Sequence, residues 1–372
     1  MKKKGFDHML KTRLTEMFGI HYPIVAAPMG PFYTTQLTVA VSEKGGLGVL
    51  SHPGLSDIDP VKEVVKSIEY VIEHTDKPFG LNIRTARLQM DAPTLIRRVA
   101  YLINHNTKIR DQLVYGLTSA GSPKEAAKVW HEKCPSLKHF HVAPSYNLAK
   151  KVVAAGCDGI VATGYEGGGH QSYEAINSTV LLAEICEDFP DKPIIACGGF
   201  STGRGLAAAL AYGACGIAMG TRFIASKECE FHPNYKQLVL KSLDEDTTIA
   251  PGFLAPIRLI KNRFTATHGK ALTREEKIKH EQELDPKGLL EELHAYELIY
   301  KNGDVENGAI PAGQSVGTIE DLPSVEEILD RIEKEAEACL RRAYELIQST
   351  TSPKIKPETK PPVKKATKSR KK

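Results

Sequence analysis

The sequence predicts an α/β protein whose main body is a (β/α)8, or TIM, barrel. Eight short segments are rich in apolar residues, and runs such as GIVAT and PIIAC are apolar throughout instead of alternating with polar residues, as parallel strands covered on both faces require. Amphipathic helical patterns separate these segments, an order typical of parallel sheets and barrels. The length of 372 residues exceeds one average domain but fits one large barrel with an insertion. We expect strands near 24–27, 48–50, 79–82, 113–116, 139–143, 159–163, 194–198 and 216–219.

The segments between the strands carry signals that begin and end helices. Asp59-Pro60 stands before an amphipathic run, and proline suits a first helical turn. The run from Ser122 to Glu125 has the spacing of a capping box. Ser145 precedes YNLAKKVVAAG, whose closing Gly156 suits a C-terminal cap. These signals support helices between the strands.

The eighth strand is not followed at once by a helix that closes the barrel. We therefore expect residues 1–225 to form the barrel and residues 226–297 a mostly helical insertion over its mouth. Residues 298–349 are expected to close the barrel and end in a helix over 323–348, which Ser324 and Glu327 begin as a capping box. Its apolar positions recur at helical spacing: Val325, Ile328, Leu329, Ile332, Leu340 and Ile347.

Composition predicts a globular cytoplasmic protein. Apolar residues make up 41% and charged residues 25% of the chain. The sequence has no apolar run long enough for a transmembrane helix, and its first residues lack the apolar stretch of a secretory signal. Seven cysteines occur with no CxxC pair, which fits a reducing compartment and argues against a disulfide framework or a zinc site.

Positive charge is concentrated at the C-terminus. Residues 353–372 contain nine Lys or Arg and one acid, Glu358, so the remaining body carries a small negative balance. This argues against a nucleic-acid groove on the body. We expect residues 350–372 to be a disordered basic tail because they contain few apolar side chains. The tail is either a solubilising segment or a tether to RNA, DNA or another anionic surface.

Glycine-rich segments follow the expected strands one, six, seven and eight. In this barrel the loops after strands seven and eight form the usual phosphate site, and glycine lets backbone N–H groups approach an anion. The helix that opens near 201–205 would add its positive end. The alternative is that these are tight turns that need glycine for geometry alone. The segments are Ala27-Pro28-Met29-Gly30, the run 163–170 (TGYEGGGH), Cys197-Gly198-Gly199 and Met219-Gly220-Thr221.

The glycine pattern favours a mononucleotide over a dinucleotide. The run Gly45–Gly48 precedes a strand, whereas a dinucleotide fingerprint must follow one. The sequence also lacks a GxxxxGK[ST] loop.

His170 is the candidate catalytic residue because it is the histidine that ends a glycine-rich loop on the functional face of the barrel. His74 and His139 fall on a helix and a strand, so we interpret them as structural. Glu166 is expected to cap or turn the same loop as His170. Asn82 ends an apolar strand and either binds a cofactor or satisfies the barrel rim. No metal site is expected, because His and Glu lack metal-ligand spacing.

In combination and order, these segments resemble the nitronate monooxygenase family, formerly called 2-nitropropane dioxygenases. They also resemble related flavin-dependent type II enoyl-acyl-carrier-protein reductases. The resemblance runs from about Arg13 to Ile332 and includes PIVAAPM, AVSEKGGLGVL, DGIVATGYEGGGH, the run 194–226 and AGQSVG.

The resemblance implies an FMN-binding barrel. Pro28-Met29 would lie along the flavin, Asn82 would contact it, and His170 would stand over it near the substrate. Many relatives have glutamine where this chain has Thr163 and Ala218, and one subgroup has a catalytic histidine in the loop after strand five, where this chain has none. The cofactor-binding residues so expected are Ala27, Pro28, Met29, Asn82, Thr163, Gly168, Gly198, Gly199, Ala218, Met219, Gly220 and Thr221, with the last three and Gly199 at the phosphate.

Three functions follow as hypotheses. The first is oxidation of an alkyl nitronate by FMN, with O2 reoxidising the flavin. The second is NAD(P)H-dependent reduction of an enoyl thioester such as an enoyl-acyl-carrier-protein. The third is a flavoprotein scaffold that its basic tail tethers to RNA or DNA, which the acidic body argues against.

Overall fold

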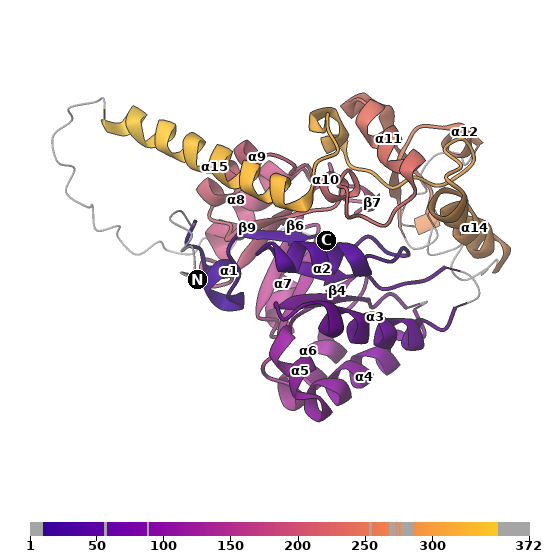
Figure 1. Cartoon of the computed structure of the whole chain (residues 1–372), viewed down its shortest axis with the longest axis horizontal. Helices are drawn as coiled ribbons and strands as arrows, with labels where there is room; N and C mark the ends of the chain where they lie inside the picture. The colour runs from indigo at the N-terminus through magenta and orange to yellow at the C-terminus, as the bar shows by residue number, and fades with distance from the viewer. Residues whose placement is uncertain are drawn as a thin grey trace.

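The computed structural model contains a barrel of eight parallel strands surrounded by helices (Figure 1). The structure describes residues 10–55, 58–87, 89–252, 255–267, 273, 275–276 and 286–348. The eight strands confirm the predicted (β/α)8 fold, with bounds that differ by a few residues at some ends. They are β1 (Ile24–Ala26), β2 (Gly48–Leu50), β3 (Phe79–Arg84), β4 (Leu113–Ser119), β5 (Lys138–Ala143), β6 (Gly159–Thr163), β8 (Ile194–Cys197) and β9 (Gly216–Met219).

The strands pair in the order β1-β9-β8-β6-β5-β4-β3-β2. A parallel bridge between Val25 and Leu47 joins the two ends, so the sheet is nearly closed. Closure places the carboxyl ends of all the strands at one rim, where this fold carries its chemistry. The interior is filled by side chains such as Tyr115, Phe140 and Ile195, all of them buried.

Helices cover the outside of the barrel, and several begin where the sequence predicts. Asp59 caps α3 by accepting hydrogen bonds from the N–H groups of Val61 and Lys62, and Ser145 caps α7 by accepting one from Leu148. The helices along the barrel are α1 (Arg13–Phe18), α2 (Thr35–Glu43), α3 (Pro60–His74), α4 (Ala92–His105), α5 (Thr107–Gln112), α6 (Lys124–Lys133), α7 (Tyr146–Ala154), α8 (Ser178–Asp188), α9 (Gly203–Tyr212) and α10 (Thr221–Ile224).

The capping box predicted at Ser122 is wrong. Pro123 occupies the cap position of α6, so no side chain caps this helix. The Ser122 hydroxyl accepts from the Lys124 N–H at 3.4 Å, and Glu125 instead forms an ion pair with Arg97 at 3.4 Å.

The segment 226–297 contains two strands in addition to helices. Strands β10 (Thr247–Ala250) and β11 (Ile257–Ile260) pair antiparallel, and β11 also pairs with β7 (Gly169–His170) from the loop after β6. Its helices lie together on the side of the barrel that carries β7 (Figure 1). They are α11 (Pro233–Lys241), the 3-10 turn η1 (Asp244–Asp246), α12 (Arg263–Thr267) and the start of α14 (Pro286–Asn302).

After the short 3-10 turn η2 (Gln314–Thr318), the long helix α15 (Val325–Gln348) packs across the barrel. The capping box of Ser324 and Glu327 is confirmed by reciprocal hydrogen bonds at 2.7 and 3.2 Å. The predicted apolar face of α15 is buried at its start, but Ile347 is exposed because α15 extends past the barrel (Figure 1). The predicted disorder of residues 350–372 concerns residues outside those that the structure describes.

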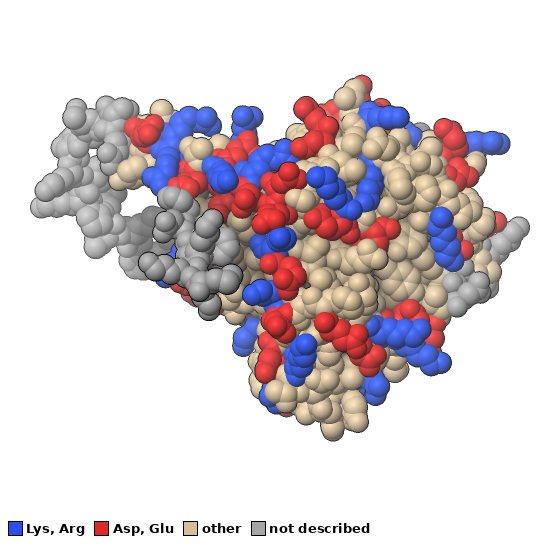
Figure 2. Space-filling model, viewed as in Figure 1, with Lys and Arg blue, Asp and Glu red and all other residues tan. Residues whose placement is uncertain are grey.

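Charges of both signs are interspersed on the face shown in Figure 2. Several of them form ion pairs around α15, including Arg331 with Asp321 at 2.7 Å and Lys44 with Glu326 at 2.9 Å. No helix in the described part of the chain is both long and apolar enough to cross a membrane.

A buried hydrogen-bonded chain crosses strands β4 and β5. The Thr118 hydroxyl lies 2.8 Å from His139 Nε2 and 2.6 Å from His141 Nδ1, and His139 Nδ1 lies 3.6 Å from the Cys157 thiol. Burial lowers the pKa of His139 to about 3 and that of His141 to about 4. His139 is therefore a neutral structural residue, as the sequence predicts.

The lowered pKa values of His139 and His141 predict that acid destabilises the fold. Between pH 6.5, their ordinary pKa, and about 4, the native chain binds fewer protons than the unfolded chain. The free energy of unfolding should therefore fall as pH is lowered through this window, by roughly 1.4 kcal/mol per unit of pKa difference. Urea unfolding at several pH values measures this slope. His139→Gln should flatten it, and His74→Gln, at a solvent-exposed site on α3, should not. Equal slopes in all three proteins would contradict the prediction.

Candidate active site

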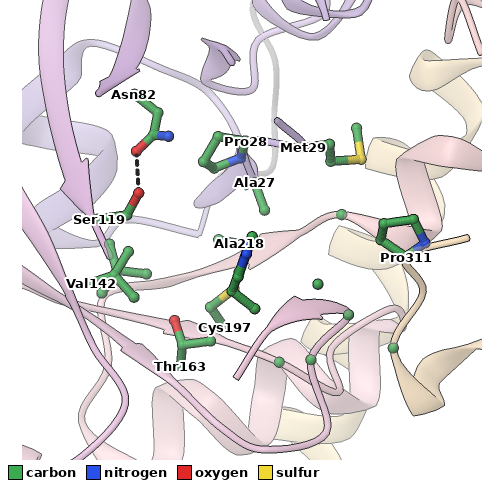
Figure 3. Close-up of a pocket in the computed structure, with 18 of the residues that line it drawn as sticks. Ala27, Pro28, Met29, Asn82, Ser119, Val142, Thr163, Cys197, Ala218 and Pro311 are labelled. Atoms are coloured by element: carbon green, nitrogen blue, oxygen red, sulfur yellow. Dashed lines mark hydrogen bonds between the residues drawn. The ribbon is translucent and has the colours of Figure 1, made fainter. Parts of the chain in front are cut away.

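A cavity of about 450 Å³ opens at the carboxyl ends of the barrel strands. Its walls come from the last residues of the strands, from the loops that follow them and from the segment around Pro311 (Figure 3). Most of the lining is apolar, with Val25, Leu117, Val142 and Val161 among the strand residues. A deep apolar pocket with few polar groups is the usual form of a cofactor or substrate site.

The structure brings nearly all of the predicted site residues to this cavity. Met219 is the exception, because its side chain is buried in the core and its carbonyl accepts a hydrogen bond from the Ala27 N–H at 2.9 Å. The predicted residues that line the cavity are Ala27, Pro28, Met29, Asn82, Thr163, Gly168, His170, Gly198, Gly199, Ala218, Gly220 and Thr221.

The loops after β8 and β9 form a cradle of backbone amides. Gly198 and Gly199 have φ of +85° and +83°, a conformation that L side chains rarely adopt. Within the described residues, no acceptor is found for the amide N–H of Gly199 or of Gly220. Such amides are suited to bind the oxygens of a phosphate. The residues present therefore fit the phosphate of a mononucleotide.

The expected contribution of the helix near 201–205 is not seen. The first amide of α9, that of Gly203, donates to Glu335 of α15 at 2.7 Å, and Thr202 accepts from Gly205. Protein oxygens therefore bind the first and third amides of α9, and none of residues 201–205 lines the cavity.

His170 is held in place by the inserted segment. It belongs to β7 and pairs with Ile257 of β11. The buried Arg258 guanidinium donates to the Tyr165 carbonyl at 3.0 and 3.2 Å, and the Gln171 N–H donates to the Pro256 carbonyl at 2.6 Å. The segment after β9 therefore fixes the loop that carries the candidate catalytic histidine.

Glu166 has the capping role that the sequence predicts. Its carboxylate accepts hydrogen bonds from the N–H and the hydroxyl of Ser178, the first residue of α8, at 3.0 and 2.8 Å. Because those contacts engage it at the helix start, Glu166 does not line the cavity beside His170.

Asn82 points into the cavity from the third strand (Figure 3). Its side-chain oxygen accepts a hydrogen bond from Ser119 at 3.1 Å, which fixes the orientation of the amide. Among the described residues no acceptor is found for its NH2 group, so it is placed to donate to a ligand in the cavity.

Cys197 and Thr163 lie next to each other in the cavity wall (Figure 3). Burial raises the pKa of Cys197 to about 11, although Thr163 hydrogen-bonds the sulfur. The thiol is therefore neutral at physiological pH, which argues against a nucleophilic role for it.

Sequence reasoning missed several lining residues. Arg84 ends β3 two residues after Asn82, and His141 lies on β5, where it reads as a core residue. Pro311 and Gly313 reach the cavity from the segment before η2, and the Tyr235 hydroxyl donates to the Pro311 carbonyl. The AGQSVG motif signals this segment, whereas no local pattern signals Arg84 or His141.

Comparison with known proteins identifies the family. Residues 11–335 match the model of the nitronate monooxygenase family. The chain belongs to the nitronate monooxygenase family. This confirms the resemblance seen in the sequence, and the family is one of oxidoreductases.

Relatives in and around the nitronate monooxygenase family differ in their named activities. A (3aS,4S,5R,7aS)-5-hydroxy-7a-methyl-1-oxo-octahydro-1H-indene-4-carboxyl-CoA dehydrogenase of Mycobacterium tuberculosis is 30% identical over 91% of this chain and 99% of its own. A probable nitronate monooxygenase of Staphylococcus aureus is 28% identical over 68% of this chain and 79% of its own. The structure of FabK from Thermotoga maritima has a TM-score of 0.76 and 30% identity, and the match covers 91% of this chain and all of that one.

Proposed function

We propose that this chain is an FMN-dependent oxidoreductase and that its substrate is an alkyl nitronate oxidised with O2. The observation that carries the cofactor assignment is the amide cradle at Gly199 and Gly220 on the rim of an apolar cavity. Asn82, whose amide is oriented by Ser119, also supports the FMN assignment because it can donate a hydrogen bond to the flavin ring. FMN bound there would supply the electron chemistry that side chains lack.

His170 is the residue that we assign to the substrate. Its backbone pairs with β11, the neighbouring Gln171 N–H bonds to Pro256, and His170 lines the cavity, which supports this role. A histidine there can orient an anionic nitronate, or remove the α-proton if the neutral nitroalkane is the substrate. The family match and the probable nitronate monooxygenases among its relatives support this substrate. The seven cysteines, all free thiols, support a cytoplasmic location.

A second candidate function is NAD(P)H-dependent reduction of an enoyl thioester such as an enoyl-acyl-carrier-protein. A specific observation favours it: the relative at 30% identity that spans nearly the whole chain is named as a carboxyl-CoA dehydrogenase, and FabK aligns over 91% of the chain. In this reaction His170 would hydrogen-bond the thioester carbonyl.

His170→Ala tests the assigned residue. We expect kcat/KM for propane 2-nitronate to fall by about 100-fold or more, the usual contribution of a general acid or base, while bound FMN, read from visible absorbance, stays at the level of the unchanged protein. His74→Ala is the matched control because His74 lies on α3, outside the cavity lining, and should leave turnover unchanged. Turnover within a few-fold in His170→Ala would contradict the role.

Anaerobic mixing with NADPH or NADH separates the two reactions. The nitronate proposal predicts that the flavin absorbance near 450 nm stays constant after mixing and is bleached by nitronate alone. Fast bleaching by either nicotinamide, followed by reoxidation with an enoyl thioester, would support the second candidate and contradict the first.

A further inference from the structure

One charged side chain faces the cavity. Arg84 is the only Lys, Arg, Asp or Glu among the lining residues that the structure describes. Its Nε atom is buried and has no hydrogen-bond partner, and no ion pair joins its guanidinium to a carboxylate within the described ranges. Burial lowers the pKa of Arg84, although Asp91 and Glu292 are near enough to raise it in part. The Arg84 side chain as a whole is half-buried, and a charge partly removed from water without a partner is costly, so an anionic partner at this position would be stabilising.

The acids nearest to Arg84 are engaged elsewhere. Asp91 accepts from His52 Nε2 at 2.8 Å and from Gln89 at 2.7 Å, and Glu292 accepts from the Tyr296 hydroxyl at 3.2 Å. Within the described residues, neither carboxylate forms an ion pair with the guanidinium.

Arg84 lies opposite the phosphate cradle. In the nearly closed order of strands, β3 is four strands from β8 in either direction and three from β9, which sets the Arg84 backbone across the barrel from Gly199. Arg84 also lies two residues beyond Asn82, on the same face of β3 and roughly 7 Å further along the strand. Asn82 is placed for the cofactor, so Arg84 occupies the next layer toward the mouth.

The backbone and the side chain of Arg84 are both positioned. Its N–H donates to His52 Nδ1 at 3.0 Å, while His52 Nε2 faces Asp91. Because Nδ1 accepts a hydrogen bond, the His52 ring is neutral, and it is fully buried. A Cβ added at Gly54 would lie 2.4 Å from Arg84 Nη2, and one at Gly30 would lie 3.5 Å from Nη1. The guanidinium therefore packs against two glycines whose lack of a side chain makes room for it.

We propose that the Arg84 guanidinium binds a planar oxyanion of the substrate, a carboxylate or a nitronate, in the layer above the cofactor. Both anions present two oxygens in one plane, and the guanidinium fork matches this geometry with two parallel N–H···O bonds. This inference rests on the proposed function and adds to it a substrate that carries such an anion. Arg84 is thus a substrate-binding residue, and His52 with Asp91 are positioning residues.

Binding of benzoate and propane 2-nitronate to the FMN-loaded protein tests the proposal, with benzamide as the uncharged probe. Flavin absorbance reports binding, and isothermal titration calorimetry reports it independently of the flavin. We expect Arg84→Gln to weaken the binding of benzoate and of the nitronate tenfold or more and to leave the binding of benzamide unchanged. Arg84→Lys should give an intermediate loss because the charge stays and the fork is lost. Arg87→Gln, at an exposed arginine of the segment that follows β3, should leave the binding of all three probes unchanged.

Gly54→Ala provides a second test that keeps every charge. The added methyl group must move the flexible end of Arg84, so benzoate should bind several-fold more weakly while FMN stays bound. If Arg84→Gln fails to fold, Arg84→Lys and Gly54→Ala decide the outcome.

Three results would overturn the proposal. One is that neither anion binds the unchanged protein more tightly than benzamide does. Another is an equal loss of affinity for the anions in Arg84→Gln and Arg87→Gln, which would indicate only a general electrostatic effect of positive charge. The last is a changed flavin spectrum or FMN affinity in ligand-free Arg84→Gln, which would place Arg84 on the cofactor. A protein that never binds FMN but still binds benzoate through Arg84 by calorimetry would overturn the proposed function alone.

Discussion

Close approach of backbone to backbone at the carboxyl rim of the barrel is the constraint on which the site depends. A Cβ at Gly198 would lie 2.5 Å from the Gly164 carbonyl oxygen, and one at Gly168 would lie 2.6 Å from backbone atoms of Ala312 and Gly313. The loops after β6 and β8 and the segment before η2 can therefore interlock only because these positions lack side chains. That contact exposes amides to the cavity and places the His170 loop over it.

The barrel can be predicted from sequence because its strands are buried on both faces. Such burial leaves a local signature in apolar runs such as GIVAT of β6 and IIAC of β8, although β5 also carries the buried polar residues His139 and His141. Local capping patterns predict less well. The box at Ser122 fails because Pro123 takes the cap position, whereas the box at Ser324 forms as its spacing predicts. The end of α9 is satisfied by Glu335, a residue too distant in sequence for any local pattern to indicate.

Some features of the candidate site can likewise be predicted from the sequence, and others cannot. Glycine-rich loops and His170 are visible in the sequence because they combine a rare composition with a position after a strand. The pairing of β7 with β11 is not visible in the sequence, because β7 has only two residues and its partner strand belongs to the segment after the barrel. Arg84 is also not visible, since an arginine at a strand end is usually solvated. Only the three-dimensional structure shows that its Nε is buried in a cavity lined by no other charged residue among those described.

The cavity has an amide cradle on one side of its rim, and a histidine and a cation line the same space. We propose that main-chain amides, not cationic side chains, hold one mononucleotide there. The most direct measurement is a fluorescence titration of the cofactor-free protein with FMN and with riboflavin, which lacks the phosphate. We expect one FMN per chain, bound at least 100-fold more tightly than riboflavin. Equal affinity for the two, or no binding of either to a folded sample, would contradict it.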